Sequence, residues 1–223
     1  MLLLIVLTSH AELGSTGKKT GFYLSELTHA LEVFDQAGVQ WVLASPKGGL
    51  PPMDGADRAD AANRRYLDDP KFMAALQKTV ALKDVDSSKF DGVYVPGGHG
   101  TMYDLPGDAH LQKIVAAVYA KSGVVAAVCH GPAALVQVTL ADGSALVAGK
   151  AVAGFTNEEE EAAGLTKVMP FLLESKLKAL GGKYSKAANW QSHVAVDGRL
   201  VTGQNPASAA GVAAETVKLL KAR

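Results

Sequence analysis

Cysteine is nearly absent from this chain, and neither sign of charge predominates. Cys129 is the only cysteine among 223 residues, so an internal disulfide framework is excluded and a reducing compartment such as the cytoplasm fits best. The 22 basic and 22 acidic side chains balance to a net charge of zero. This balance gives no electrostatic case for nucleic acid or an anionic membrane as a partner, so we expect neither to be bound.

Long apolar runs are also missing. The opening stretch MLLLIVL is apolar but short, and it lacks the basic region and the small-residue cleavage site of a signal peptide. No run approaches the length of a membrane span, so we interpret the opening stretch as a buried first strand. Repeats, low-complexity tracts and linkers are absent as well, and we therefore expect a single domain over residues 1–223.

What the chain does contain is an alternation of apolar strand-like stretches with stretches of helical periodicity. The predicted strands cover 2–7, 39–45, 91–95, 124–128 and 150–155, with a hairpin over 193–203. The predicted helices cover 21–38, 70–79, 108–123, 132–138, 170–182 and 206–223, and 46–69 is expected to be a long surface loop. This alternation predicts an α/β fold with a mostly parallel sheet covered by helices on both faces.

The lone thiol of Cys129 stands where an apolar strand breaks into Cys-His-Gly-Pro. In such a sheet, the carboxyl end of a strand lies at the ligand-binding edge. Gly131 permits a tight turn and Pro132 suits the first turn of a helix, which predicts a nucleophile elbow that departs from G-x-S-x-G. The positive end of the helix would favour thiolate, so we expect a more acidic thiol than usual, with His130 as a proton carrier. The alternative is a buried, inert cysteine.

A second predicted strand ends in Pro96-Gly97-Gly98. Glycines at a strand end let backbone N–H groups approach an anion closely, and with the N–H of the residue after Cys129 they could form an oxyanion hole. A plain turn is the simpler interpretation. A dinucleotide-binding fingerprint is also conceivable, but its third glycine is missing after Gly100.

Together these stretches resemble a known family. DGVYVPGGHG, AVCHGPAAL and GFYLSELTHALEVF are similar to the DJ-1/PfpI superfamily, and more closely to its Hsp31-like, glyoxalase III branch. GKAVAGFTNEEEE, MPFLLESKLKALGG and DGRLVTGQNPASA extend the resemblance over almost the whole chain. The resemblance implies a flavodoxin-like, class I glutamine amidotransferase-like fold. It also implies a cysteine-dependent lyase that converts methylglyoxal and water to lactate without glutathione or a cofactor.

The same resemblance implies roles for particular residues. Cys129 matches the nucleophile, His130 the adjacent catalytic histidine, and Glu26 a buried glutamate that contacts the thiol. From the residues alone, a glutamate in the middle of an amphipathic helix would be solvated, so the role of Glu26 rests on the resemblance.

The third member of the triad falls in a run of four glutamates, Glu158–Glu161. The resemblance places it at Glu160, with Glu159 and Glu161 as alternatives, whereas such a run is ordinarily a solvated acidic face. Gly97 and Gly98 match the glycines on the oxyanion side.

No metal is expected, because the metal-binding triad of some larger Hsp31 relatives is not evident. His10 could line the same edge of the sheet. The other isolated histidines lack metal-ligand spacing and are expected to be surface or structural groups, namely His29, His99, His110 and His193. Trp190 and Asn205-Pro206 fall in loops that could rim a pocket.

Two other functions remain open. A stress chaperone or redox sensor of the Hsp31 type would use apolar surface or oxidation of Cys129. A cysteine amidase or peptidase would use the same Cys-His-Glu arrangement for acyl transfer. For the glyoxalase we expect a small dicarbonyl substrate and a homodimer.

Overall fold

A seven-stranded sheet forms the centre of the computed structural model, which describes residues 1–222. The strands lie in the order β10-β11-β7-β6-β1-β3-β5, and every neighbouring pair is parallel except β10 with β11. Their bounds are β1 (Leu2–Val6), β3 (Gln40–Ser45), β5 (Val80–Ala81), β6 (Gly92–Val95), β7 (Val124–Val128), β10 (Val194–Asp197) and β11 (Leu200–Gly203). The predicted mostly parallel sheet is confirmed.

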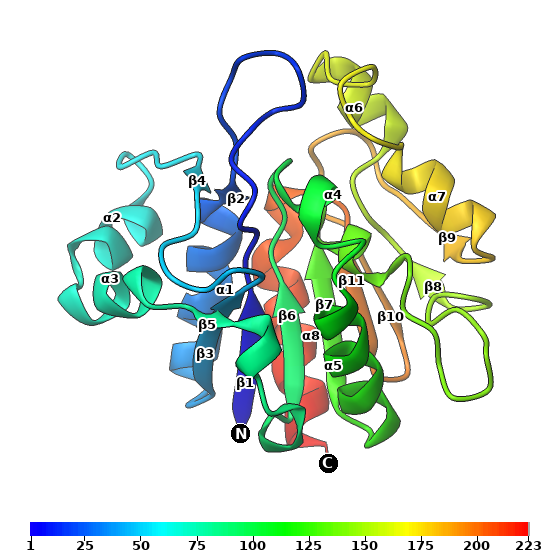
Figure 1. Cartoon of the computed structure of the whole chain (residues 1–223), viewed down its shortest axis with the longest axis horizontal. Helices are drawn as coiled ribbons and strands as arrows, with labels where there is room; N and C mark the ends of the chain where they lie inside the picture. Colours follow the sequence, from blue (N-terminus) through cyan, green and yellow to red (C-terminus); the bar gives the residue numbers. More distant parts are fainter. Residues whose placement is uncertain (223) are drawn as a thin grey trace.

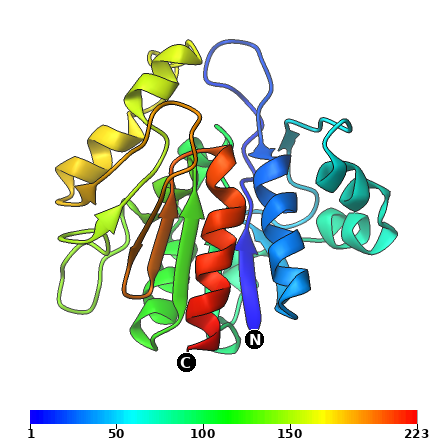
Figure 2. The same ribbon diagram turned by 180° about the vertical axis from the view of Figure 1, so that it is seen from behind.

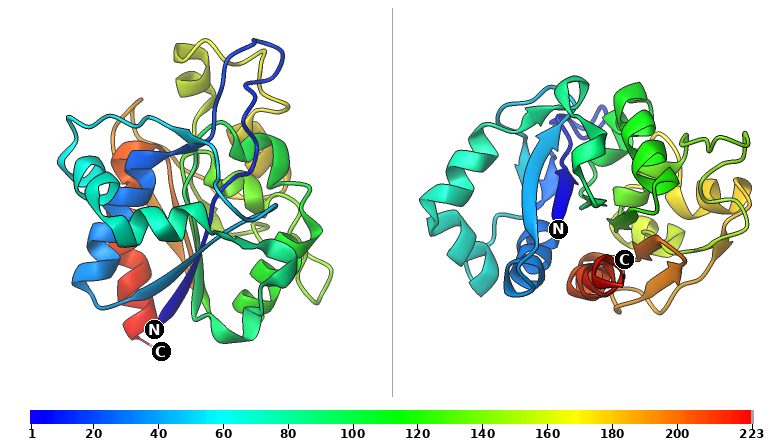
Figure 3. Two further views of the ribbon diagram at one scale, coloured as in Figure 1. Left: turned by 60° about the vertical axis from the view of Figure 1, so that its left-hand side comes forward. Right: turned by 90° about the horizontal axis from the view of Figure 1, so that it is seen from below.

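Helices cover both faces of this sheet. α1 (Leu24–Gln36) and α8 (Ala209–Lys221) pack side by side on one face, as Figure 2 shows from behind. α5 (Ala109–Ala120) covers β6 and β7 on the other face (Figure 1). The view from below in Figure 3 shows the resulting three layers, with the sheet in the middle. Because β6 and β7 lie between two helical layers, all of their residues are buried, as their continuous apolar sequences indicate.

The predicted loop over 46–69 is wrong in part, because it contains a helix. α2 (Ala61–Asp68) begins where the side chain of Asp60 accepts a hydrogen bond from the N–H of Asn63, and it buries Tyr66. Before it, β4 (Met53–Asp54) pairs with β2 (Phe22–Tyr23). After it, α3 (Pro70–Gln77) starts with proline in its first turn, as predicted.

The predicted helix over 132–138 is replaced by a short 3₁₀ helix, η3 (Gly131–Leu135). The other 3₁₀ helices described are η1 (Leu82–Asp84), η2 (Ser87–Lys89) and η4 (Pro206–Ser208). The predicted strand over 150–155 shrinks to β8 (Ala151–Val152), which pairs with β9 (Lys183–Tyr184) outside the main sheet. It ends after Val152 because the following backbone N–H groups donate elsewhere: Ala153 to Oγ1 of Thr202 (2.8 Å) and Phe155 to the carbonyl of Cys129 (2.8 Å).

A small layer of helices lies above the carboxyl edge of the sheet (Figure 1). It contains α4 (Thr101–Asp104), α6 (Asn157–Ala162) and α7 (Leu173–Ala179). α6 was not predicted, although a capping box starts it: Thr156 and Glu159 exchange side-chain and backbone hydrogen bonds.

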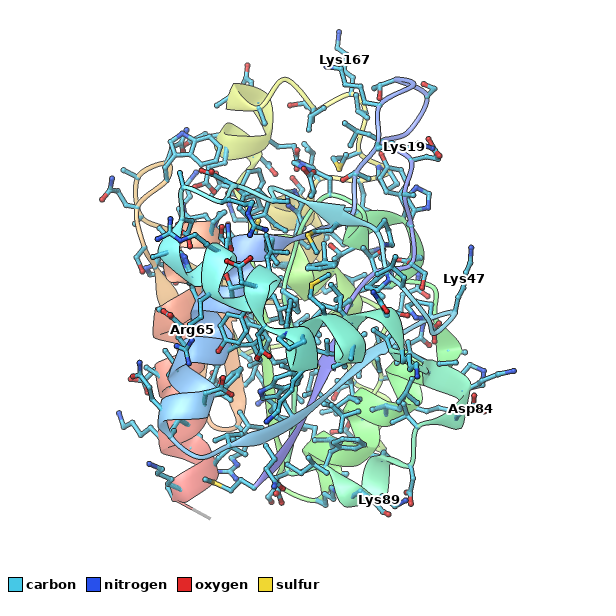
Figure 4. All side chains as sticks on the ribbon, turned by 90° about the vertical axis from the view of Figure 1, so that its left-hand side faces the viewer. Lys19, Lys47, Arg65, Asp84, Lys89 and Lys167 are labelled. Carbon is cyan, nitrogen blue, oxygen red and sulfur yellow. The ribbon has the colours of Figure 1, made fainter. Side chains whose placement is uncertain are left out.

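Many lysines and arginines lie on the outside of the fold, whereas four glutamates are buried, namely Glu26, Glu159, Glu160 and Glu174. Lys47 and Lys167, labelled in Figure 4, project away from the ribbon. Over residues 1–222, the structure has no helix that is long and apolar enough to cross a membrane.

Candidate active site

A cavity of about 240 Å³ opens at the carboxyl edge of the sheet. The ends of the paired strands β6 and β7 deliver Gly98 and Cys129 to it, and the first turn of α1 contributes Glu26. This is the edge where open parallel sheets bind their ligands. Three stretches that are far apart in the sequence therefore meet at one thiol.

Cys129 sits on a sharply turned backbone. Its φ of 60° lies in the left-handed region, which non-glycine residues rarely adopt and which is common at functional sites. Hydrogen bonds fix the turn: its N–H donates to the carbonyl of Gly203 (3.0 Å), and its carbonyl accepts from the N–H of Phe155 (2.8 Å). Gly131 must be glycine here, because a Cβ would lie 2.2 Å from the carbonyl oxygen of Val95. The geometry is that of a nucleophile elbow.

His130 connects the thiol to a carboxylate. Its Nδ1 lies 3.3 Å from Sγ of Cys129, and its Nε2 lies 2.7 Å from Oε2 of Glu160. Because Nε2–H donates to Glu160, the lone pair of Nδ1 faces the thiol. Burial lowers the pKa of His130 to about 4, assisted by His99 and opposed by Glu160. A neutral imidazole in this tautomer can accept the thiol proton.

Glu160 is the glutamate of the acidic run that meets His130. Burial raises its pKa, but hydrogen bonds with His130 and His99 outweigh this effect and lower the pKa to about 2. Glu159 turns away and accepts a hydrogen bond from the backbone N–H of Trp190 (2.8 Å). Glu158 is largely exposed and pairs with a lysine. The helical geometry of α6 thus presents one carboxylate to the imidazole.

Glu26 is fully buried, whereas its position in the helix pattern suggests solvation. Oε2 accepts the N–H of Gly97 at 2.5 Å, and Oε1 has no hydrogen-bond partner within residues 1–222. Burial raises the pKa of this carboxyl to about 8, against the lowering effect of its interactions with Cys129 and Gly97. A protonatable carboxyl therefore lines the cavity and adjoins the thiol of Cys129.

The expected acidic thiol is contradicted. Burial first, and then the neighbouring Glu26, raise the pKa of Cys129 well above its ordinary value, although the N–H groups of His130 and Gly98 act in the opposite sense. The favourable helix end is also missing, because the elbow leads into the short η3 and a single turn has little macrodipole. Two buried acids that adjoin each other cannot both ionise at neutral pH.

Gly97 and Gly98 have different roles from those expected. The N–H of Gly97 is occupied by Glu26, so it is unavailable to an oxyanion. A Cβ on Gly97 would lie 2.6 Å from the backbone nitrogen of His130, so a glycine is needed for close approach. Gly98 lines the cavity, and its N–H and that of His130 point to the thiol. These two N–H groups are the donors available for an oxyanion.

His99 is the site residue that the sequence reasoning missed. It was expected to be a surface or structural group, but it lines the cavity and its Nε2 lies 2.9 Å from Oε1 of Glu160. Its ring centroid is 4.2 Å from that of His130. The available signal is its place between two glycines in the turn that follows the buried strand β6. His10, in contrast, stacks on Tyr103 outside the cavity lining.

Within residues 1–222, His99, His130 and Glu160 are also the group that could hold a metal ion. Their ligand atoms lie within 4.8 Å of one another, and two imidazoles with a carboxylate form a set that Zn²⁺ accepts. Both Nε2 atoms, however, are engaged in hydrogen bonds to Glu160. The expectation of no metal stays a prediction.

A thiol on a strained elbow at the carboxyl edge of a doubly wound sheet defines a class of α/β proteins with a cysteine nucleophile elbow. A model of the DJ-1/PfpI family matches residues 18–219, and the chain belongs to this family.

Individual relatives match over nearly the whole chain. The X-ray structure of Rapid Encystment Protein 24 KDa from Francisella tularensis is 39% identical, with a TM-score of 0.95 and 98% of each chain covered. The crystal structure of glyoxalase III from Candida albicans is 33% identical, with a TM-score of 0.93, covering 100% of this chain and 98% of that one. Glutathione-independent glyoxalase HSP31 of Saccharomyces cerevisiae is 34% identical over 98% of this chain and 97% of the relative. These similarities support the Hsp31-like, glyoxalase III branch.

Proposed function

We propose that this protein is a glutathione-independent glyoxalase, which converts methylglyoxal and water to lactate without a cofactor. The observation that carries the proposal is the buried Glu26 carboxyl beside the thiol of Cys129, with Oε1 unpartnered at the cavity. The names of the relatives from Candida albicans and Saccharomyces cerevisiae support the same activity. The enzyme's own thiol takes the place of glutathione.

Cys129 acts first, as a nucleophile. Its sulfur bonds to the aldehyde carbon C1 while the thiol proton passes to Nδ1 of His130, 3.3 Å away. Glu160 stabilises the resulting imidazolium through its hydrogen bond with Nε2. The C1 oxygen becomes an alkoxide that the N–H groups of Gly98 and His130 can bind, and its protonation gives a hemithioacetal.

Glu26 then moves a proton between the two carbons. Its carboxylate form removes the C1 proton, the electron pair forms the C1=C2 bond of an enediolate, and the proton of the C1 hydroxyl passes to the C2 oxygen. Return of the first proton from Glu26 to C2 then leaves C1 as the thioester carbonyl. C1 is thereby oxidised and C2 reduced, so no external electron acceptor is needed, and the product is a thioester of lactate. A pKa of about 8 is close to the working pH, which suits a group that must both take and give a proton.

Water completes the reaction. It attacks the thioester carbonyl with His130 as the base, the carbon–sulfur bond breaks, and the thiol of Cys129 recovers its proton. The sum of methylglyoxal and water is lactic acid, so every atom is accounted for.

The alternatives make less use of these groups. An amidase or peptidase needs Cys129, His130 and Glu160 but leaves Glu26 without a role. A chaperone or redox sensor requires no turnover, so the ordered imidazole–carboxylate pair would have no role in it.

Lactate formation from methylglyoxal, assayed without glutathione, tests the proposal. EDTA-treated protein should retain activity, and Cys129→Ala should lose nearly all of it while its melting temperature shows that it is folded. Absence of lactate with the wild-type protein, or a fully active Cys129→Ala variant, would overturn the proposal. Metal dependence would overturn its cofactor-free form.

A further inference from the structure

One wall of the cavity is aromatic. The ring of Phe155 lies against His130 with a centroid distance of 4.2 Å, and the indole of Trp190 continues the wall at 5.8 Å from Phe155. Tyr23 and Pro206 also line the cavity. An apolar surface therefore runs from the reacting groups outward to Trp190.

The backbone of Trp190 has a strained conformation. Its side chain is 50% exposed, and its φ of 65° lies in the left-handed region. The buried carboxylate of Glu159 accepts its N–H at 2.8 Å and also binds the side-chain amides of Gln204 (3.0 Å) and Asn205 (2.8 Å). A loop fixed by hydrogen bonds to the buried side chain of Glu159 therefore keeps a half-exposed indole at the cavity.

Methylglyoxal is too small to use this wall. Even at a generous ~30 Å³ for each of its five non-hydrogen atoms, more than a third of the cavity volume stays empty. When C1 is bonded to the sulfur of Cys129, the methyl group of methylglyoxal extends only one carbon beyond C2 toward the aromatic wall. A larger substituent can reach the rings of Phe155 and Trp190.

We propose that Phe155 and Trp190 bind the C2 substituent of the substrate, so that the site prefers 2-oxoaldehydes with an aromatic substituent to methylglyoxal. This inference rests on the proposed glyoxalase function. The chemistry is unchanged: phenylglyoxal and water give mandelate through the same thiol addition, proton transfer and hydrolysis. Aromatic rings gain interaction energy from edge and offset contacts with other rings, and a methyl group cannot make such contacts.

The test compares kcat/KM for phenylglyoxal and for methylglyoxal in wild-type protein and three variants. We expect the wild-type value to be at least about tenfold higher for phenylglyoxal, since even one methylene in an apolar pocket is worth about that much. Trp190→Ala should lower the phenylglyoxal value about tenfold, mainly through KM, and change the methylglyoxal value less than twofold. Trp190→Phe should restore most of the preference. Leu50→Ala, which truncates an exposed apolar side chain elsewhere, should change neither value.

The outcomes separate the two proposals. If the wild-type protein converts methylglyoxal but phenylglyoxal is no better, or if Trp190→Ala slows both aldehydes equally, the aromatic-substituent inference is wrong. If the wild-type protein converts neither aldehyde, the glyoxalase function itself is wrong.

Discussion

At the scale of single residues, the site keeps one carboxyl ionised and another protonated within a small volume. Burial raises the pKa of both, but hydrogen bonds with two imidazoles lower that of Glu160 to about 2, whereas burial prevails at Glu26 and raises its pKa to about 8. Pairs of carboxyls with such different environments divide the work of orienting a base and of moving a proton. The two glutamates should therefore respond differently to the loss of charge.

Glu160→Gln should lower kcat by roughly 10²–10⁴-fold, because an amide cannot stabilise the imidazolium that forms when Cys129 attacks. Glu158→Gln is the matched control, since its side chain is exposed and forms a salt bridge with Lys186. Steady-state lactate formation and melting temperature should be measured for both. Equal, small effects would mean that the acidic run is only a solvated face.

The thiol offers a second residue-scale prediction. Because burial and Glu26 raise its pKa, alkylation of Cys129 by iodoacetamide should keep accelerating above pH 9. Glu26→Gln removes the second negative charge and should speed alkylation at pH 8 by about tenfold, which corresponds to one pKa unit. A plateau of the wild-type rate below pH 7 would show an acidic thiol and contradict this account.

At the scale of elements, the carboxyl ends of β6 and β7 supply the elbow, and the short helix α6 supplies its carboxylate. α6 has only the residues Asn157–Ala162, so it depends on its capping box and on its neighbours for its position. The same Glu159 that closes the capping box also holds the loop of Trp190. One buried side chain thus couples the triad to the rim of the cavity.

Thr156→Ala removes the hydroxyl that accepts the N–H of Glu159, and it should lower the free energy of unfolding by about 1 kcal/mol. Because α6 carries Glu160, kcat should also fall severalfold. Thr156→Ser keeps the hydroxyl and is the control. Chemical denaturation and lactate formation measure the two effects, and a destabilised Thr156→Ala variant with unchanged kcat would show that the cap does not position Glu160.

The elements that the sequence predicts best are those with strong periodicity. The strands β1, β3, β6 and β7, the hairpin and the helices α1, α5 and α8 follow from apolar patterns and from capping residues. The elements that the sequence does not predict depend on tertiary contacts, and a sequence pattern carries no information about these contacts. α2 is polar apart from a few buried residues, and η3 begins at Gly131, where a Cβ would clash with the carbonyl oxygen of Val95.

The site residues can also be divided into those that the sequence predicts and those that it does not. The strand-end position of Cys129 follows from the sequence, whereas the burial of Glu26 does not, because a helix pattern cannot tell a solvated glutamate from a functional one. His99 was missed since an isolated histidine carries no spacing signal; only the folded edge brings it to Glu160.

At the scale of the whole molecule, burial of Glu26 links stability to pH. Its pKa of about 8 in the folded protein exceeds the ordinary 4.5, so the folded state binds more protons than the unfolded state between these values. The free energy of unfolding should therefore fall as pH rises through this window.

Urea denaturation at pH 5 and pH 9 measures this linkage. Relative to Glu26→Gln, the protein that retains Glu26 should lose about 2–4 kcal/mol over the interval. Groups that do not interact directly with Glu26, including His130 and Glu160, are common to both proteins and cancel in the difference. Cys129 does not cancel, because Glu26 raises its pKa, so the comparison is made in the Cys129→Ala background. An identical pH dependence of the two proteins would mean that Glu26 is ionised throughout.

Three whole-molecule expectations stay predictions: a single domain over 1–223, a homodimer, and location in the cytoplasm. Charge balance and composition constrain them only loosely, because assembly and location depend on surfaces and signals rather than on the core.

The central claim is that Glu26 carries the proton between the two carbons of a substrate already bonded to Cys129. Glu26→Gln keeps the size of the side chain but removes its exchangeable acid. Incubated with methylglyoxal, this variant should show by intact-protein mass spectrometry and peptide mapping one adduct on Cys129, absent from the Cys129→Ala/Glu26→Gln double variant. Its lactate formation should fall by roughly 10²–10⁴-fold. Lactate formation at the wild-type rate by the Glu26→Gln variant would contradict the mechanism.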